Sequence, residues 1–472
     1  MKYITRFAPS PTGNPHVGNI RTALFDYLTA KSSNGKFFLR IEDTDRERFV
    51  PEAIDNIHQS LEWLGIKPDG DVIYQSSRLS IYQDRVHELL DKGQAYKCFC
   101  SKERLEKLHQ DLEKADKPPI YDRHCLNMSA DEIAKKEKTG ESCVVRFKIP
   151  EKPTEISWTD KVRGTVNFST KILEDFIILK SDGWPTYNLA HIIDDHDMGI
   201  NIVIRGEEFV PSTPKYILVY QALGWERPEY AHMPLTLGND HKKLSKRHGD
   251  TAILDYKDKG YLPEAMINFL VLLGWNPGNG ATEEIYSMET LEKIFKIDDV
   301  NKAPAIFDLE RLDWMNGVYI RNLTVSELTE RLVNFKLDYK KINREFFERI
   351  VTVEQNRLKT LFEFEEISDF YFNLAEYEPS LLVFKKSSPE TTRKGLEAVL
   401  TELNGYEWGN VENFDGLLSD IVEKNRLTNA DVYWPLRVAL SGKDKSPSPA
   451  ELLWVLGKDE SIIRLHKALS LL

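Results

Sequence analysis

The chain has 472 residues, a net charge of −12, 41% hydrophobic residues and 29% charged residues. This composition is typical of a soluble globular protein of roughly two to four domains, and four cysteines in this length exclude a disulfide-rich scaffold. We find no apolar run of membrane-spanning length, no signal peptide and no Arg-rich presequence, so we expect a cytoplasmic protein without a membrane partner, in which any nucleic acid must meet a local basic surface.

The chain begins with a predicted strand–helix–strand unit. A β-prone run over residues 3–7 leads into a loop rich in proline and glycine, and a second strand covers residues 36–41. Between them, Asn14 is expected to be the N-cap of a helix, with Pro15 as its first residue. Apolar residues then recur with a helical period until the helix ends near residue 34.

This unit places His16 and Gly18 in the first turn of the helix. Free backbone N–H groups and the positive end of the helix dipole favour a phosphate at such a place. A lone His-x-Gly is a weak signal, however, and His16 read by itself is equally a plain helix-start residue.

Further along, one helix is predicted over residues 52–64 and another within residues 74–96. The pattern then changes to a helix rich in lysine and glutamate, followed by β-prone and hairpin segments. Strand–helix–strand periodicity returns over residues 174–209, and beyond about residue 322 the chain is almost entirely amphipathic helix.

These changes predict an α/β protein with a doubly wound, Rossmann-like domain formed by residues 1–84 and 184–240. An insertion at residues 85–183 splits that domain. Residues 241–322 form a connecting region, and residues 323–472 form an all-α half of one or two domains.

A basic loop, "HKKLSKRHGD" at residues 241–250, follows the last predicted strand. Most charge runs are solvated surface. Here, however, the loop and the turn at His16 would both face the crevice at the carboxyl ends of parallel strands, where ligands bind in such sheets. A lysine-rich loop there could neutralise charge that develops on a phosphate.

Together these segments resemble signature blocks of a known family. "APSPTGNPHVGN" is similar to the HIGH-type signature and "KLSKR" to the KMSKS-type loop of class I aminoacyl-tRNA synthetases. "RFAPSPTG", "RIEDTDRER", "SDGWPTYNLA", "VIRGEE", "STPKY" and "LDWMNGVYIR" resemble, in order, blocks of the bacterial glutamyl-tRNA synthetases. The resemblance extends over the whole chain.

The resemblance implies ATP-dependent ligation of L-glutamate to the 3′ end of tRNA-Glu through a glutamyl-adenylate, with Mg²⁺ accompanying ATP. It assigns the insertion to the acceptor end of tRNA, residues 241–322 to the KMSKS-type loop and stem contacts, and residues 323–472 to the anticodon. Catalysis falls to His16, Gly18, Lys243 and Lys246. ATP binding falls to His16, Gly18, Asn19, Lys243, Leu244, Ser245, Lys246 and Arg247.

The amino-acid pocket is expected at three charged strand ends, since Arg6, Glu42 and Arg205 each end a predicted strand. Glutamate carries one cation and two anions, so its site needs a carboxylate and at least one guanidinium. By resemblance, Arg6 takes the side-chain carboxylate and Glu42 the ammonium group. The full set that the resemblance implies is Arg6, Ala8, Ser10, Glu42, Tyr187, His191, Arg205 and Glu208.

The sequence departs from the family pattern at a few positions. The HIGH-type tetrad reads "HVGN", without its second histidine, and the basic loop has Leu244 in place of methionine and Arg247 in place of serine. His191 stands where asparagine is expected, which affects the fine geometry of the pocket.

Cysteines in the insertion predict a zinc site. Cys98, Cys100, Tyr121 and Cys125 fit a C-x-C…Y-x3-C pattern known in some members of the family, and thiolates suit structural Zn²⁺. The alternatives are that the three cysteines are packing residues, or that His124 replaces Tyr121 as the fourth ligand.

Several alternatives stay open at this stage. Within the class, these are a glutaminyl-tRNA synthetase, which carries β-barrels in place of the helical half, and a glutamyl-queuosine tRNA synthetase, which lacks an anticodon domain. From another class, a tRNA-binding or adenylate-forming regulator is the competitor. A monomer is expected, whereas the residues that read the anticodon and the use of tRNA-Gln as a second substrate are not predicted.

Overall fold

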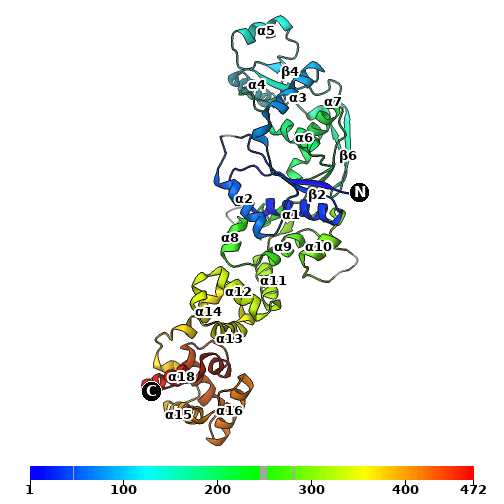
Figure 1. The fold of residues 1–472 in the computed structure, drawn as a ribbon. Coiled ribbons are helices and arrows are strands. Elements are labelled where there is room, and N and C mark those ends of the chain that lie inside the picture. The colour runs from blue at the N-terminus through cyan, green and yellow to red at the C-terminus, as the bar shows by residue number, and fades with distance from the viewer. Residues whose placement is uncertain (46, 245–251, 279, 281) are drawn as a thin grey trace. The chain divides into compact units, whose positions relative to one another are not determined.

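The computed structural model describes residues 1–45, 47–244, 252–278, 280 and 282–472. The chain forms two compact units (Figure 1). The first consists of Met1–Lys257 and Met266–Asp308, and the second of Asp258–Ala265 and Leu309–Leu472.

The first unit is built on parallel strands. Strands β1 (Ile4–Phe7), β2 (Lys36–Ile41) and β3 (Ile73–Tyr74) form one parallel sheet. Strands β9 (Ile202–Gly206) and β10 (Glu229–Met233) pair in parallel, and β10 also pairs in parallel with β6 (Glu155–Asp160), which forms a hairpin with β7 (Gly164–Ser169).

The two sets of strands meet at β1 and β9. Just before β9, the Asn201 amide N–H donates to the Ile4 carbonyl at 3.2 Å, and the Ile4 N–H donates to Oδ1 of Asn201 at 2.7 Å. The chain leaves β1 toward β2 on one side, whereas β9 lies on the other side. Such a change of direction opens a crevice at the carboxyl ends of the strands, so the predicted doubly wound fold is confirmed.

Helix α1 (Val17–Ser32) connects β1 to β2 and packs against both. Its N-cap is His16, so the prediction of Asn14 was wrong. Nδ1 of His16 accepts the Gly18 N–H at 3.1 Å, which is the bond that a capping side chain makes. After the helix, Gly35 is required because a Cβ there would lie 1.7 Å from the Tyr3 carbonyl oxygen.

The other helices near the sheet are α2 (Glu52–Trp63), α3 (Leu79–Asp91), α6 (Tyr187–Asp197) and α7 (Thr213–Leu223). Helices α3, α6 and α7 supply much of one core, whose fully buried residues include Tyr82, Ile193 and Val219. The first unit also contains a short parallel pair, β11 (Thr236–Leu237) and β12 (Ala305–Ile306), and helices α8 (Ile253–Asp258), α9 (Pro263–Leu272) and α10 (Met288–Ile294), of which α8 and α9 continue into the second unit.

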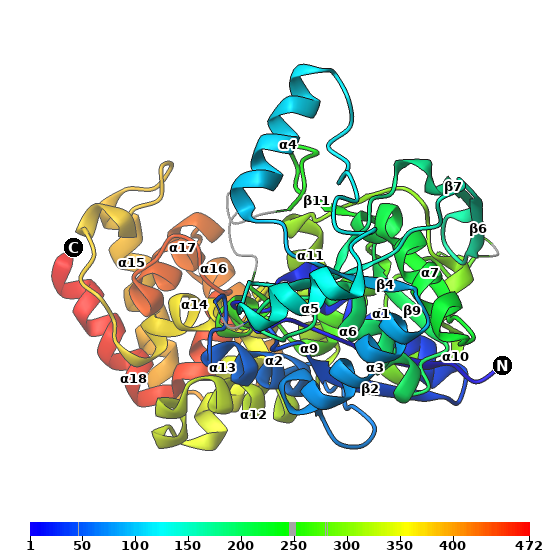
Figure 2. The same cartoon turned by 90° about the horizontal axis from the view of Figure 1, so that it is seen from above.

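The predicted insertion contains its own antiparallel sheet of β4 (Ala95–Cys98), β5 (Val144–Phe147) and β8 (Ile177–Leu179). Helices α4 (Lys102–Lys114) and α5 (Ala130–Lys138) accompany it (Figure 2). The hairpin of β6 and β7 also falls within residues 85–183, yet β6 joins the main sheet through Tyr230 opposite Asp160. The predicted insertion therefore supplies two strands to the sheet that it splits.

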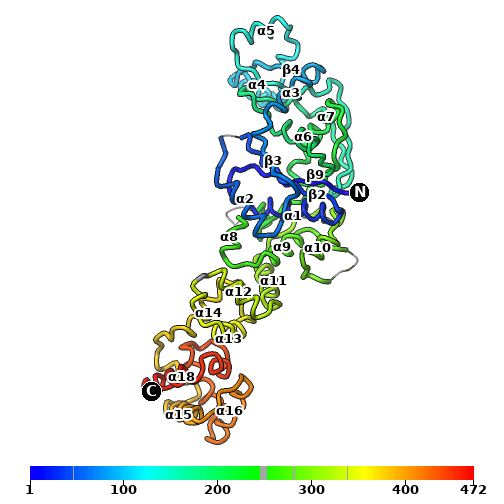
Figure 3. Tube along the Cα trace, viewed as in Figure 1, coloured from blue at the N-terminus to red at the C-terminus, as the bar shows by residue number. Residues whose placement is uncertain are grey.

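The second unit is helical, as the trace in Figure 3 shows for its yellow-to-red segments. Its core is formed by fully buried apolar side chains such as Leu332, Ile350 and Leu453. Its main helices are α11 (Leu309–Asn322), α12 (Val325–Phe335), α13 (Arg344–Glu354), α14 (Glu363–Phe372), α15 (Pro389–Gly405), α16 (Val411–Lys424), α17 (Asn429–Ser441) and α18 (Pro449–Leu471). Among the described residues, none of the helices combines the length and apolar character needed to span a bilayer.

A buried carboxyl group makes the stability of this unit depend on pH. Glu354 is fully buried, and its carboxyl accepts bonds from the Tyr371 hydroxyl at 3.1 Å and from Arg357 Nη1 at 2.9 Å. Burial raises the pKa of Glu354 from 4.5 to about 7, although Arg357 opposes that shift. The folded state therefore binds more protons than the unfolded state between these two values.

We expect the free energy of unfolding of the second unit to fall by about 3 kcal/mol as pH rises from 4.5 through 7. A raised carboxyl pKa adds stability at low pH, and this stability is lost on ionisation. Urea unfolding of the wild type and of Glu354→Gln at pH 5 and pH 8 measures the effect, because glutamine cannot titrate. Identical pH dependence in the two proteins would contradict the prediction.

Candidate active site

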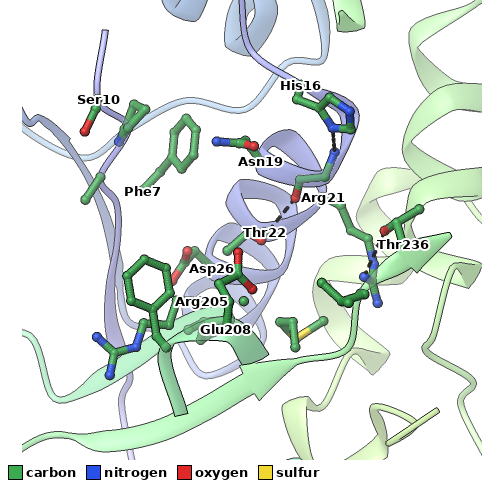
Figure 4. Close-up of a pocket in the computed structure, with 18 of the residues that line it drawn as sticks. Phe7, Ser10, His16, Asn19, Arg21, Thr22, Asp26, Arg205, Glu208 and Thr236 are labelled. Atoms are coloured by element: carbon green, nitrogen blue, oxygen red, sulfur yellow. Dashed lines mark hydrogen bonds between the residues drawn. The ribbon is translucent and has the colours of Figure 1, made fainter. Parts of the chain in front are cut away.

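A cleft of about 470 Å³ opens at the carboxyl ends of β1 and β9 (Figure 4). It brings together most of the residues that the sequence predicts for the site. The predicted residues that line it are Arg6, Ala8, Ser10, His16, Gly18, Asn19, Glu42, Tyr187, Arg205, Glu208, Lys243 and Leu244. His191 is predicted but does not line the cleft, and Ser245, Lys246 and Arg247 lie outside the described residues.

His16 presents a hydrogen-bond donor to the cleft. Its Nδ1 accepts the Gly18 N–H, so the single proton of the neutral ring is on Nε2. Burial and the neighbouring Lys243 both lower the pKa of His16, which keeps the ring neutral near pH 7. The Gly18 N–H is used in its bond to His16 Nδ1 and is not free for a ligand. His16 Nε2–H is therefore the donor that this capping arrangement offers to a ligand at the start of α1.

Arg6 is fixed by a buried ion pair at the end of β1. It is only 4% exposed, and its Nε donates to Asp195 Oδ1 at 2.9 Å. Arg40 Nη1 donates to the same oxygen at 2.7 Å and Arg40 Nη2 to Glu42 Oε1 at 3.0 Å. Burial works against ionisation of Asp195, but Arg6 and Arg40 hold its pKa below the usual value. Arg6 and Arg40 thus form ion pairs with the carboxylates of Asp195 and Glu42, and these pairs hold the four side chains in place at the cleft.

Arg205 is the last but one residue of β9 and is 6% exposed. Its Nη2 donates to Thr213 Oγ1 at 2.9 Å, and its Nε donates to Nε2 of His232 at 3.2 Å. Its Nη1 has no hydrogen-bond partner among the described residues. The guanidinium therefore keeps donors for an anionic ligand in the cleft.

His191 supports a residue that does line the cleft. Its ring stacks on Tyr187 with the centroids 4.4 Å apart, and its Nδ1 lies 2.5 Å from the Tyr187 carbonyl oxygen. Burial lowers the pKa of His191 to about 3, so the ring is neutral. His191 thus lies behind Tyr187, one helical turn later, and does not itself line the cleft.

The basic loop reaches the cleft through its described part. Lys243 Nζ lies 4.0 Å from Glu208 Oε1, and both side chains are exposed. A loose pair of this kind leaves the lysine available for another anion.

Sequence reasoning missed several polar residues of α1. Asp26 is fully buried, and neither of its carboxylate oxygens has a hydrogen bond within the described part of the chain. Burial raises the pKa of Asp26 well above its usual value. Thr22 and Asp26, which also line the cleft, follow the predicted Gly18 at steps of four and so share its helix face, and this spacing is the signal that could have found them.

The three predicted cysteine ligands converge in the insertion. The Sγ atoms of Cys98, Cys100 and Cys125 all lie within 4.8 Å of one another. The Tyr121 hydroxyl is 3.4 Å from the first two sulfurs. His124 is exposed, and its ring nitrogens are outside this group of ligand atoms. Three soft thiols with a fourth polar atom beside them fit a closed tetrahedral zinc site.

Comparisons with known proteins match both units. A family model described as tRNA synthetases class I (E and Q), catalytic domain, matches residues 2–314, and an anticodon binding domain matches residues 327–469. A glutamate–tRNA ligase of Clostridium botulinum (strain Hall) is 43% identical over 98% of this chain and 97% of its own. That of Clostridium tetani is 42% identical over 98% of this chain and 96% of its own.

Solved structures are similar along the full length. A glutamate tRNA ligase from Elizabethkingia meningosepticum, in complex with its amino acid, superimposes with a TM-score of 0.92 at 33% identity, covering 100% of this chain and 99% of the other. Glutamate-tRNA synthetase from Elizabethkingia anophelis gives a TM-score of 0.87 at 32% identity, covering 100% of both chains.

Proposed function

The chain belongs to the glutamate–tRNA ligase family of class I tRNA synthetases, and we propose that it joins L-glutamate to the 3′ end of tRNA-Glu with conversion of ATP to AMP and pyrophosphate. One observation carries the proposal: Arg6, Glu42 and Arg205 line the same cleft as His16. Two guanidiniums and a carboxylate complement the two anions and one cation of glutamate, and the start of α1 suits phosphates.

The glutamate α-carboxylate is the nucleophile of the first step. It attacks the α-phosphorus of ATP, the bond to the β-phosphate breaks, and pyrophosphate leaves. A hydroxyl of the terminal tRNA ribose then attacks the acyl carbon and releases AMP. The protein supplies position and charge stabilisation in both steps.

Each cleft residue has a role in that scheme. His16 donates from Nε2 to the ATP phosphates beside Gly18 and Asn19, while Lys243 neutralises negative charge on the leaving pyrophosphate. Lys246 is proposed to act with Lys243, by family resemblance. When bound with ATP, Mg²⁺ supplies further neutralisation of phosphate charge.

Amino-acid recognition follows from the strand ends. We assign the side-chain carboxylate of glutamate to Arg6 and the α-carboxylate to Arg205, whose Nη1 is without a partner among the described groups. Glu42 receives the ammonium group. Ala8, Ser10, Tyr187 and Glu208 complete the walls.

We also propose that Cys98, Cys100 and Cys125 hold one structural zinc ion, with the Tyr121 hydroxyl as the fourth ligand. The convergent sulfurs support this proposal. Its place is in the insertion, which we assign to the acceptor end of tRNA. All four cysteines are free thiols, which suits the reducing cytoplasm.

The helical second unit supports a glutamate–tRNA ligase over the alternative tRNA synthetases. A glutamyl-queuosine tRNA synthetase would lack this half, and a glutaminyl enzyme would carry β-barrels there. A regulator without aminoacylation activity would not need the set of cleft residues that is present.

The test is charging of purified tRNA-Glu and tRNA-Gln with radiolabelled glutamate or glutamine and ATP. We expect glutamate to be attached to tRNA-Glu in an ATP-dependent manner. Transfer of glutamine alone, or of no amino acid by folded protein, would refute the proposal. The tRNA-Gln arm decides separately whether the enzyme uses both tRNAs.

A further inference from the structure

A buried chain of three side chains runs across neighbouring strands behind the cleft. Asp160 ends β6, His232 lies in β10 and Arg205 is the last but one residue of β9. His232 lies directly opposite Arg205 in the strand pairing. Asp160 is 1% exposed and His232 is not exposed at all. Asp160 Oδ2 lies 2.5 Å from Nδ1 of His232, and Nε2 of His232 lies 3.2 Å from Nε of Arg205.

Both neighbours require the same tautomer of His232. A carboxylate accepts hydrogen bonds, so Nδ1 of the ring must carry the proton that it donates to Asp160. Arginine only donates, so Nε2 must be the unprotonated acceptor. Burial lowers the pKa of His232, although Asp160 opposes the shift, and the ring is therefore neutral and able to accept.

The hydrogen bonds of Arg205 then leave one of its buried nitrogens unpaired among the described residues. Its Nε donates to His232 Nε2 and its Nη2 to Thr213 Oγ1. The Thr213 hydroxyl lies 2.9 Å from the Phe209 carbonyl oxygen and 3.2 Å from His232 Nε2, so its proton can go to either acceptor. Three aromatic rings surround the guanidinium. The distances from Arg205 Cζ to the ring centroids are 5.1 Å for Phe209, 4.8 Å for Tyr216 and 5.6 Å for Tyr230. Nη1 remains without a partner within the described chain.

We propose that Asp160 and His232 are positioning residues that orient Arg205 toward the substrate carboxylate. The proposal rests on the function given above. Neither residue lines the cleft, so both act through Arg205. A neutral imidazole can hold the guanidinium without cancelling its charge, whereas a carboxylate at position 232 would compete directly with an anionic substrate.

The other contacts of this pair are mostly to the backbone. Asp160 Oδ1 accepts the N–H groups of Val162, Arg163 and His232 at 3.1, 2.9 and 3.1 Å. The Arg163 side chain donates to the carbonyl of His232, not to its ring. Asp160 Oδ1 therefore binds the backbone at the strand ends, and Asp160 Oδ2 sets the tautomer of His232.

This division makes Asp160→Asn a selective test. The asparagine oxygen can keep the three backbone bonds, while its amide N–H groups face Nδ1 of His232. The ring must then move its proton to Nε2, which places an N–H against the Arg205 N–H. We expect the KM for glutamate to rise about 10- to 100-fold, with the KM for ATP close to wild type and the Tm lowered, because two buried N–H groups then face each other.

Asp175→Asn is the matched control. Asp175 is equally buried and also combines backbone and side-chain bonds. It accepts from Ile149 N–H, Tyr96 and Arg123, and these partners include neither His232 nor Arg205. It should lower the Tm without changing the KM for glutamate.

A second pair of variants decides the case if Asp160→Asn fails to fold. His232→Gln retains an acceptor for Arg205 and a donor for Asp160, whereas His232→Leu retains neither, so the glutamine variant should bind glutamate more tightly. An unchanged KM for glutamate in folded Asp160→Asn, a parallel rise in the KM for ATP, or equal KM values for the two His232 variants would overturn the proposal. Absence of glutamate-dependent activity in the wild type would instead refute the proposed function.

Discussion

Replacing Arg205 by alanine should reduce kcat/KM for glutamate by about 10²- to 10³-fold, with the larger part in KM. The side chain is 6% exposed, and aromatic rings surround its guanidinium, so water replaces it poorly. The variant leaves the substrate α-carboxylate without its cationic partner, and it leaves the buried His232 Nε2 without the Arg205 donor. Steady-state charging of tRNA-Glu at varied glutamate and varied ATP measures the two KM values separately.

Two further variants make this test specific. Arg205→Lys keeps the charge but cannot reach His232, Thr213 and the substrate at once, so it should recover only part of the loss. Arg227→Ala removes an exposed arginine that donates to the Ser157 carbonyl at 3.4 Å and does not line the cleft, so this variant should be neutral. A KM change for ATP larger than that for glutamate would contradict the assignment of Arg205.

The strand ends of the candidate site could be predicted because their signals are local. A β-prone run followed by proline, glycine and a helical period fixes β1 and α1 within a short stretch of chain. Parallel strands then place Arg6 and Arg205 at one edge without further information. The helical second unit followed in the same way from its periodicity.

What the sequence did not reveal depends on contacts between distant segments. The pairing of β6 with β10 joins residues about 70 positions apart. Local sequence patterns therefore place the hairpin in the insertion and carry no signal for Asp160. His232 lies within a buried strand, where a histidine looks like a core residue. Its role becomes visible only when Asp160 and Arg205 are placed on either side of its ring.

Helix capping shows the same limit on a smaller scale. Asn14 and His16 can both cap a helix, and the sequence favoured asparagine on general preference. The structure selects His16 because its Nδ1 reaches the Gly18 amide. This choice matters for function, since it fixes which ring nitrogen carries the proton toward the cleft.

Purified full-length protein should contain close to one zinc ion per chain, and the double variant Cys98→Ser, Cys100→Ser should contain almost none. Two of the three convergent sulfurs are then lost, and serine hydroxyls are poor zinc ligands. Elemental analysis of protein prepared without chelator measures the metal. Cys143→Ser is the control, because Cys143 is the remaining cysteine of the chain and is outside the cluster.

Loss of the metal should also act on function in a particular way. The segment from β4 to Tyr121 and Cys125 has only a small core of its own. Cys98 and Cys125 are buried members of that core, and the half-buried Cys100 packs against it. A structural zinc contributes directly to the folding of such a segment. The double variant should therefore lose most tRNA charging and become sensitive to protease between residues 98 and 125, while it still binds ATP in the cleft. Metal-free wild-type protein with full charging activity and intact protease resistance would return the three cysteines to a packing role.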